Sequence, residues 1–236
     1  MLDVKCGSGA FMKTEAEGRV LAEKMVAIGK ACGRNVAALV TNMDVPLGNC
    51  IGNSLEVMEA VEVLKGKDGD LRQLCSALAA QLLSLCHGWS REEADEKVRN
   101  AIDSGKAFAT MEAWVAAQGG DARALTDHSL LPGTAVKYPV KAPCDGWICH
   151  MDAEKVGISS SLLGAGRMKK EDSIDYGAGI VLQRKTGDFV RAGETLAWLH
   201  TNDESRISQA EGLFLSALTW SEEKPAAQNL IYGIVR

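Results

Sequence analysis

Lys5 and the glycine turn that follows it are the first residues of the chain whose types and spacing could do chemistry. Leu2–Lys5 has the pattern of a strand end, and Gly7–Phe11 forms a glycine turn before a helix. Backbone N–H groups in such a turn can hold a phosphate. The turn is no Walker loop and lacks the third glycine of a dinucleotide fingerprint, so a plain tight turn is the simpler interpretation. Lys5 would lie where open α/β sheets bind ligands, although an ordinary surface lysine is an equal alternative.

Two other stretches could bind ions. Residues 49–53 lead into Glu56 and Glu59, and could offer backbone carbonyls and one carboxylate to a hard cation. On spacing alone, a capped helix with solvated acidic residues is the better interpretation. Residues 164–170 (GAGRMKK) could form an anion-binding loop, and a solvated turn is equally consistent with them.

The cysteines indicate reduced thiols. The chain has seven, an odd number, at positions 6, 32, 50, 75, 86, 144 and 149. Because Cys32, Cys75 and Cys86 fall in apolar, helix-like patterns, we expect buried thiols in a cytosolic protein. Cys144, Cys149 and His150 lack the paired CxxC spacing of a zinc site.

Composition narrows the class of protein. The 236 residues suffice for one or two domains. With 26 basic and 31 acidic residues the net charge is −5, which argues against non-specific nucleic-acid binding. No apolar run reaches the roughly 18–20 residues of a membrane span, and no export signal is evident. We therefore expect a cytoplasmic protein with neither nucleic-acid nor membrane partners.

The elements that must position these residues follow an α/β pattern in the first half of the chain. Apolar residues from Leu21 to Cys32 recur at helical spacing, and Gly33 would end that helix. Val36–Thr41 is a short apolar run, typical of a strand covered on both faces. The expected helices are 14–32, 53–66, 70–88, 90–105 and 106–118.

The second half of the chain is predicted to be a separate, mostly β module over 136–236, with one helix near 204–219. Residues 119–135 are turn-rich and form a plausible linker. Residues 186–196 have a hairpin-like rhythm. The expected β-type runs are Val136–Val140, Gly146–Met151, Gly179–Gln183, Thr195–His200 and Leu230–Val235.

The same rhythm is similar to the hairpin of biotinyl and lipoyl carrier domains. Those carriers present a modifiable lysine in a turn, whereas the corresponding residues here, 200–203, are His-Thr-Asn-Asp. A carrier role is therefore the weakest of the functions considered.

Taken together, three motifs resemble the pyrimidine-nucleoside phosphorylases, the family that includes thymidine phosphorylase. The motifs are LDVKCGSGAFM, VTNMDVPLGNCIGNSLEVMEA and DYGAGIVLQRKTGDFVRAGETLAWLH, and their order and spacing agree with the family along the whole chain. Family chains are roughly twice as long, and the matching region is their C-terminal half. The resemblance implies an α/β fold, a partial parallel-sheet α/β domain followed by a C-terminal α+β barrel-sandwich-like domain. The domains expected are a remnant of the helical domain and hinge (1–8), the partial α/β domain (9–120), a linker (121–135) and the C-terminal domain (136–236).

The resemblance also implies a reaction. These pentosyltransferases cleave uridine, thymidine or deoxyuridine with inorganic phosphate as co-substrate and use no organic cofactor. Lys5 matches the family lysine that contacts the pyrimidine base, where an ammonium would favour the negative charge that develops as the glycosidic bond breaks. An arginine, a serine and a phosphate loop of the family lie upstream of the matching region. The chain alone is therefore expected to be inactive or nearly so, and no catalytic residue is assigned.

Some bacterial members of the family hold a monovalent cation or calcium. By resemblance, the ligands here would be carbonyls of Leu47 and Cys50 and the carboxylate of Glu59, as an incomplete site for potassium or calcium. Since the upstream half of that site has no match, weak or no ion binding is expected.

Two consequences concern assembly. The chain could be a non-catalytic subunit or assembly module, completed in trans by a separate N-terminal half. Because the family's sheet also uses strands upstream of the matching region, strand 36–41 of the chain alone would have an exposed edge and face, which predicts limited solubility or self-association. The family homodimer packs largely through the helical domain, so this homodimer is not expected here.

Overall fold

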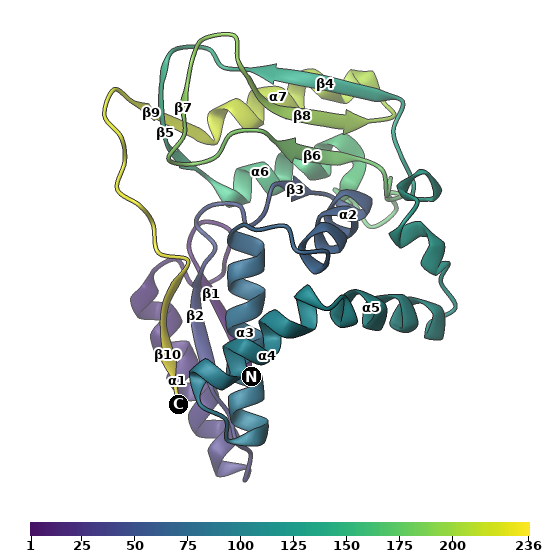
Figure 1. Ribbon diagram of the computed structural model, residues 1–236. Coiled ribbons are helices and arrows are strands. Elements are labelled where there is room, and N and C mark those ends of the chain that lie inside the picture. The colour runs from purple at the N-terminus through teal and green to yellow at the C-terminus, as the bar shows by residue number, and fades with distance from the viewer. The chain divides into compact units, whose positions relative to one another are not determined.

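The computed structural model describes all 236 residues, which form two compact units (Figure 1). One unit consists of residues 1–47, 62–114 and 228–236, and the other of residues 48–61 and 115–227. Segment 48–61 was expected in the α/β domain but belongs to the second unit, and segment 228–236 was expected in the C-terminal domain but belongs to the first unit. None of the helices combines the length and the apolarity that crossing a bilayer requires.

The first unit is built on a three-stranded sheet in the order β1-β2-β10. Its strands are β1 (Leu2–Cys6), β2 (Ala38–Asn42) and β10 (Ile231–Val235). β1 runs parallel to β2, and β10 pairs with the other side of β2 in the antiparallel sense. All five residues of β2 are buried. The prediction that strand 36–41 has an exposed edge and face was therefore wrong, because β10, expected in the β module, covers that edge.

One helix packs on a face of the three-stranded sheet, and four more helices follow it in the first half of the chain. α1 (Glu15–Ala31) begins with a capping box between Thr14 and Glu17, and packs on the face formed by Val4, Cys6 and Val40. α3 (Asp70–His87) packs against α4 (Arg91–Asp103), and α5 (Lys106–Ala117) follows. Together with α2 (Asn53–Leu64), these are the five helices predicted from periodicity and capping, each within two residues at either end.

The second unit contains two antiparallel sheets. The first has the order β3-β6-β8-β4, formed by Cys50–Ile51, Gly179–Leu182, Thr195–Thr201 and Val136–Lys141. The second has the order β7-β5-β9, formed by Phe189–Val190, Gly146–Met151 and Leu218–Ser221. The hairpin suggested by residues 186–196 does not form, because β7 and β8 pair in different sheets.

The second unit also contains more helix than predicted. α7 (Ile207–Ser216), preceded by a 3-10 turn at Glu204–Arg206, is the expected helix. α6 (Ala153–Ser160), which continues into a π-helical turn at Ser161–Ala165, was missed. α6 packs against α7, and Val156 and Phe214 are fully buried in the core of the unit. The expected linker contains 3-10 turns at Ala122–Leu125 and His128–Leu130.

Candidate functional site

Lys5 lies near the carboxyl end of β1 and is held by neighbours on the same sheet. Successive strand residues point to opposite faces, so Asp3 and Lys5 share one face while Val4 and Cys6 are buried under α1 on the other. The Lys5 ammonium forms an ion pair with the Asp3 carboxylate. Oδ1 of Asp3 in turn accepts a hydrogen bond of 2.5 Å from the hydroxyl of Thr41 on β2. The Lys5 side chain is still 42% exposed, so a ligand can reach the ammonium.

Cys75 of α3 lies near this charged pair. Burial raises the pKa of the Cys75 thiol, the Asp3 carboxylate raises it further, and the Lys5 ammonium opposes both effects. The residue is open to solvent on one side, but it also lines an apolar groove of about 350 Å³ with Ala79 and Leu82. Cys75 therefore has apolar side chains on one side and is close enough to Asp3 and Lys5 for their opposite charges to affect its thiol.

The glycine turn uses its own amide groups. The N–H of Gly7 donates to the carbonyl of Met12 at 3.0 Å, and the N–H of Gly9 donates to a carbonyl of the loop after β2, also at 3.0 Å. The N–H of Ser8 donates to Oδ1 of Asp44 at 3.0 Å. Because these donors are used within the protein, the turn does not favour a phosphate cradle, and the tight-turn interpretation describes it better.

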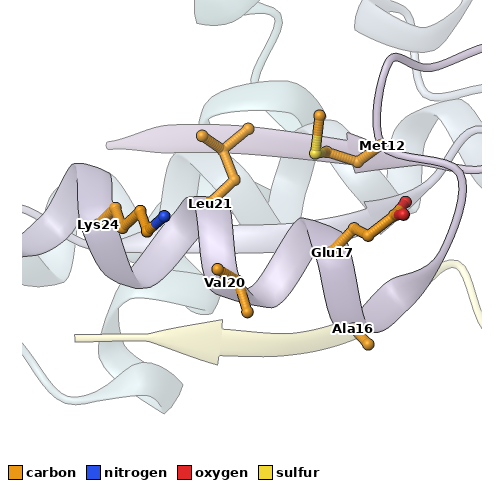
Figure 2. Close-up of a pocket in the computed structure, with 6 residues that line it drawn as sticks. All are labelled: Met12, Ala16, Glu17, Val20, Leu21 and Lys24. Carbon is orange, nitrogen blue, oxygen red and sulfur yellow. The ribbon is translucent and has the colours of Figure 1, made fainter.

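A hollow of about 410 Å³ lies along α1, starting beside the end of β1. Its lining residues are Met12, Ala16, Glu17, Val20, Leu21 and Lys24 (Figure 2). Met12 pairs with Cys6, the residue after Lys5, and Met12 and Leu21 point to the same side of α1. The carboxylate of Glu17 accepts the N–H groups of residues 13 and 14, so this charge caps the helix. The hollow is thus a mainly apolar surface of α1, and Lys5 does not line it.

The predicted cation ligands lie on the loop between β2 and β3 and on α2. Glu59 is buried, with 7% exposure, so the expectation of a solvated acid was wrong for it. The Glu59 carboxylate accepts the N–H of Asn49 at 2.8 and 3.0 Å and that of Cys50 at 3.0 Å. The structure therefore brings Glu59 and Cys50 together, and Leu47 directly precedes Gly48 in the same loop. The loop thus turns the N–H groups of Asn49 and Cys50 toward the Glu59 carboxylate, whereas a cation site would need carbonyl oxygens there.

The other sequence candidates are the loop 164–170 and the cysteines. Oδ2 of Asp172 accepts the N–H groups of Met168 and Lys169 at 3.0 and 2.8 Å, so the loop 164–170 uses two of its own anion-binding donors. All seven cysteines are free thiols. Only one of them, Cys6, is buried; the prediction of buried thiols at Cys32, Cys75 and Cys86 was wrong, because these side chains lie on helix surfaces that solvent reaches.

Two family models match the chain. Residues 1–108 match the a/b domain of a glycosyl transferase family, and residues 147–221 match the C-terminal domain of pyrimidine nucleoside phosphorylase. The chain is 43% identical over its full length to the pyrimidine-nucleoside phosphorylase of Staphylococcus epidermidis, of which it covers 54%. It is 41% identical, over 98% of its length, to the pyrimidine-nucleoside phosphorylase of Geobacillus stearothermophilus, of which it also covers 54%.

The chain belongs to the pyrimidine-nucleoside phosphorylase family. This confirms the family suggested by the three motifs. The chain spans about half the length of the curated phosphorylases that it matches.

For this member of the family, the structure adds neighbours of Lys5 that the sequence motifs do not reveal. Asp3 pairs with Lys5, and Thr41 donates a hydrogen bond to Asp3. The i, i+2 spacing of Asp3 and Lys5 on a predicted strand was the signal that could have found Asp3. Thr41 is the partner of Lys5 in the register of β1 and β2, which only the fold reveals.

Proposed function

We propose that the chain is the C-terminal portion of a pyrimidine-nucleoside phosphorylase. The intact enzyme would transfer a pentosyl group from uridine, thymidine or deoxyuridine to inorganic phosphate, giving the free base and ribose or deoxyribose 1-phosphate. The matched family models and the names of the relatives support this class of reaction. The observation that carries the proposal is the accessible, paired ammonium of Lys5 near the carboxyl end of a parallel strand.

In this proposal Lys5 binds the pyrimidine base and stabilises its departure. When the bond between sugar and base breaks, the electron pair stays on the ring, and negative charge spreads to the ring carbonyl oxygens. A fixed ammonium next to one of these oxygens stabilises that charge more than it stabilises the neutral nucleoside. The Asp3–Thr41 contacts restrict where the ammonium lies, so less reorganisation is needed when the charge develops.

We further propose that the isolated chain turns over slowly or not at all. The amides of the glycine turn are used internally, and the loop 164–170 uses two of its own, so neither offers the donors that a phosphate needs. The residues Leu47, Cys50 and Glu59 are proposed to bind potassium or calcium weakly or not at all, because amide hydrogens already surround the carboxylate.

The alternative function is that of a subunit completed in trans by a separate N-terminal half. One observation favours this alternative: β1 is an open edge in a parallel pairing, whereas parallel strands are normally covered. Under this alternative, Lys5 has the same chemical role within the assembled complex.

The test is a phosphorolysis assay with each of the three nucleosides. The purified chain alone is expected to show at most about 1% of the turnover of the full-length Geobacillus stearothermophilus relative. Turnover close to that of the relative would refute the proposed inactivity. The chain is then mixed with the separately produced N-terminal half of that relative, and restored turnover would support completion in trans.

Lys5 is tested in whichever preparation turns over. Lys5→Met is expected to lower kcat/KM by a factor of about 10²–10³, the range measured for loss of one donor to a developing anion. Lys30→Met, which removes an exposed lysine at the end of α1, serves as the matched control and should change little. Equal effects of the two substitutions would contradict the role proposed for Lys5.

A further inference from the structure

The free edge of β1 presents backbone groups next to two opposite charges. The N–H of Leu2 donates to the carbonyl of Ala37 at 2.9 Å. Because alternate residues of a parallel strand bond to the same neighbour, the N–H and C=O groups of Asp3 and Lys5 point away from β2. No other strand pairs with β1 on that side. The side chains of Asp3 and Lys5 share one face of the sheet, and Val4 is buried on the other.

A second copy of β1 fits this edge when it runs antiparallel with Val4 opposite Val4. Asp3 of each copy then lies opposite Lys5 of the other, and both form hydrogen-bonded pairs because their backbone groups point outward. Opposite charges directly across an antiparallel pair are stabilising, and like charges are destabilising. Sliding one strand by two residues would place Lys5 opposite Lys5 or Asp3 opposite Asp3. The charges therefore favour a single, symmetric register.

The two flanks of α1 face different edges of the sheet. Arg19 lies toward β10, because a Cβ atom at Gly233 would be 3.1 Å from its guanidinium. Leu21 lies about 200° further around the helix. It points to the same side of α1 as Met12, which bridges to Cys6 on the free side of β1 (Figure 2). The flank that carries Leu21 therefore lies toward the free edge.

This flank is an apolar stripe. Leu21, Met25 and Ile28 recur at the spacing of one helix face, and the last two are exposed. Leu21 and Met12 both line the hollow along α1. Phe11, the residue before Met12, is also exposed. A group of exposed apolar side chains beside an unpaired strand edge is typical of a surface that another molecule covers.

The register of β1 brings the two α1 helices together. Gly18 lies over Cys6, since a Cβ atom at Gly18 would be 3.3 Å from that of Cys6. With rises of about 1.5 Å per helix residue and 3.3 Å per strand residue, a twofold axis at Val4 crosses α1 near Ala22, next to Leu21. Because α1 lies over β1 and β2, two copies of it would be about two strand spacings apart, roughly 10 Å. Helices pack at about this distance.

The same symmetry explains the two most exposed large apolar side chains, Phe11 at 99% and Ile28 at 64%. Ile28 lies about 15 Å along α1 from Gly18, which is beyond the first residue of β1. The antiparallel arrangement places that end of one copy beside the end of the partner's β1, where Phe11 and Met12 follow Cys6. Ile28 of each copy would therefore contact this turn of the other.

We propose that two copies of the chain form a closed twofold dimer through β1 and the apolar flank of α1. The two three-stranded sheets then join into one sheet, with β10 at both outer edges. The proposal concerns the chain by itself and does not depend on the reaction proposed above. The dimer occupies the edge that a separate N-terminal half would need, so the two assemblies exclude each other.

Sedimentation velocity of the full chain over a concentration series measures the dimer. The mass should rise from that of one chain, 25.2 kDa, and level off at twice this value, because the twofold arrangement leaves no free β1 edge. A mass that stays at one chain, or that passes two, would overturn the proposal.

Reversing the charges tests the register. Asp3→Lys alone places lysine opposite lysine, and Lys5→Asp alone places aspartate opposite aspartate, so each should raise the dimer dissociation constant at least about fivefold. Mixed in equal amounts, the two variants should form heterodimers about as tight as the unsubstituted dimer, because every pair across the interface again has opposite charges. Effects within one chain cannot produce this rescue. A mixture that associates no better than its components would contradict the register.

The double variant Asp3→Lys with Lys5→Asp keeps the test decisive if a single substitution prevents folding. It restores opposite charges within and between chains, so it should dimerise like the unsubstituted chain, and a folded but monomeric double variant would overturn the proposal. Glu23→Lys, an exposed charge reversal one turn after Arg19 on α1, is the control and should leave the dissociation constant unchanged.

The contribution of α1 is tested with a matched pair of exposed isoleucines. Ile28→Ser should raise the dissociation constant at least about threefold, because it removes an apolar contact from each half of the interface. Ile158→Ser, on α6 of the second unit, should change nothing. Equal effects of these two substitutions would exclude the flank of α1 from the interface.

Discussion

At the scale of single residues, the proposed site depends on the ammonium of Lys5, whose surroundings can be probed without turnover. Asp3 pairs with Lys5, and both charges act on the thiol of Cys75 across the face of the sheet. Because the thiolate is the form that attacks an alkylating reagent, the rate at which Cys75 is modified reports the combined effect of burial and these two charges on its pKa.

We expect substitutions of the two charged residues to move the Cys75 pKa in opposite directions. Asp3 raises this pKa, so Asp3→Asn should lower it and speed alkylation by iodoacetamide below the thiol pKa. Lys5 lowers it, so Lys5→Met should raise it further and slow the reaction. Each change should be about twofold to fivefold at partly screened distances. The rates follow from peptide mass spectrometry over a pH series, with fragment ions that separate Cys75 from Cys86.

Lys30→Met is the control for this experiment and should leave the Cys75 profile unchanged. Shifts of the same sign in Asp3→Asn and Lys5→Met would contradict the arrangement of charges around Cys75.

At the scale of elements, the loop between β2 and β3 keeps its shape because Gly48 leaves room for Glu59. Gly48 has φ +68°, a left-handed conformation that favours glycine, and a Cβ atom at this position would lie only 2.5 Å from Oε2 of Glu59. Any side chain at this position would therefore lower the stability in two ways, by straining the backbone and by displacing Glu59.

Comparison with a second glycine separates these costs. Gly193, in the same unit, has φ +84° with no atom within 4 Å of a built Cβ. Gly193→Ala should therefore destabilise by about 1–2 kcal/mol through the backbone alone, whereas Gly48→Ala should cost about 2–5 kcal/mol because it also displaces Glu59. Urea unfolding measures both free energies, and equal losses would mean that the Glu59 contact does not hold the loop.

The elements that could be predicted from sequence are those specified by nearby residues. The start of α1 depends on Thr14 and Glu17, three residues apart, and the start of α4 on Ser90 and Glu93. α6 was missed because its eight residues include glycine and two serines, and because the burial of Val156 against α7 stabilises it more than local propensity does.

The candidate site also has residues that local sequence patterns predict and contacts that they do not. The place of Lys5 follows from a local strand-and-turn pattern, as does that of Asp3 two residues earlier. The bond from Lys185 to Gly48 joins residues that no local pattern connects, and so does the pairing of β10 with β2. Side-chain periodicity tells which face a strand buries but does not identify its neighbour, so these contacts had to come from the fold.

At the scale of the whole molecule, β1 forms an open edge of its sheet. The N–H of Leu2 bonds to the carbonyl of Ala37 at 2.9 Å. In a parallel ladder alternate residues bond to the same neighbour, so the backbone groups of Asp3 and Lys5 face away from β2. The other edge of the sheet, β10, is interrupted by a register shift between Ile231 and Gly233, which protects an edge from pairing.

We therefore expect the isolated chain to self-associate through β1 rather than through residues 36–41. Sedimentation velocity should show an average mass that rises with protein concentration. Hydrogen exchange at the same concentrations should show that the amides of Asp3 and Lys5 gain protection, because a second strand pairs with them. The amides of β10 are the internal control and should exchange at a constant rate, since the bulge there disfavours a regular ladder. A monomer at every concentration, or protection that appears at β10 instead, would show that the β1 edge is not the surface through which chains associate.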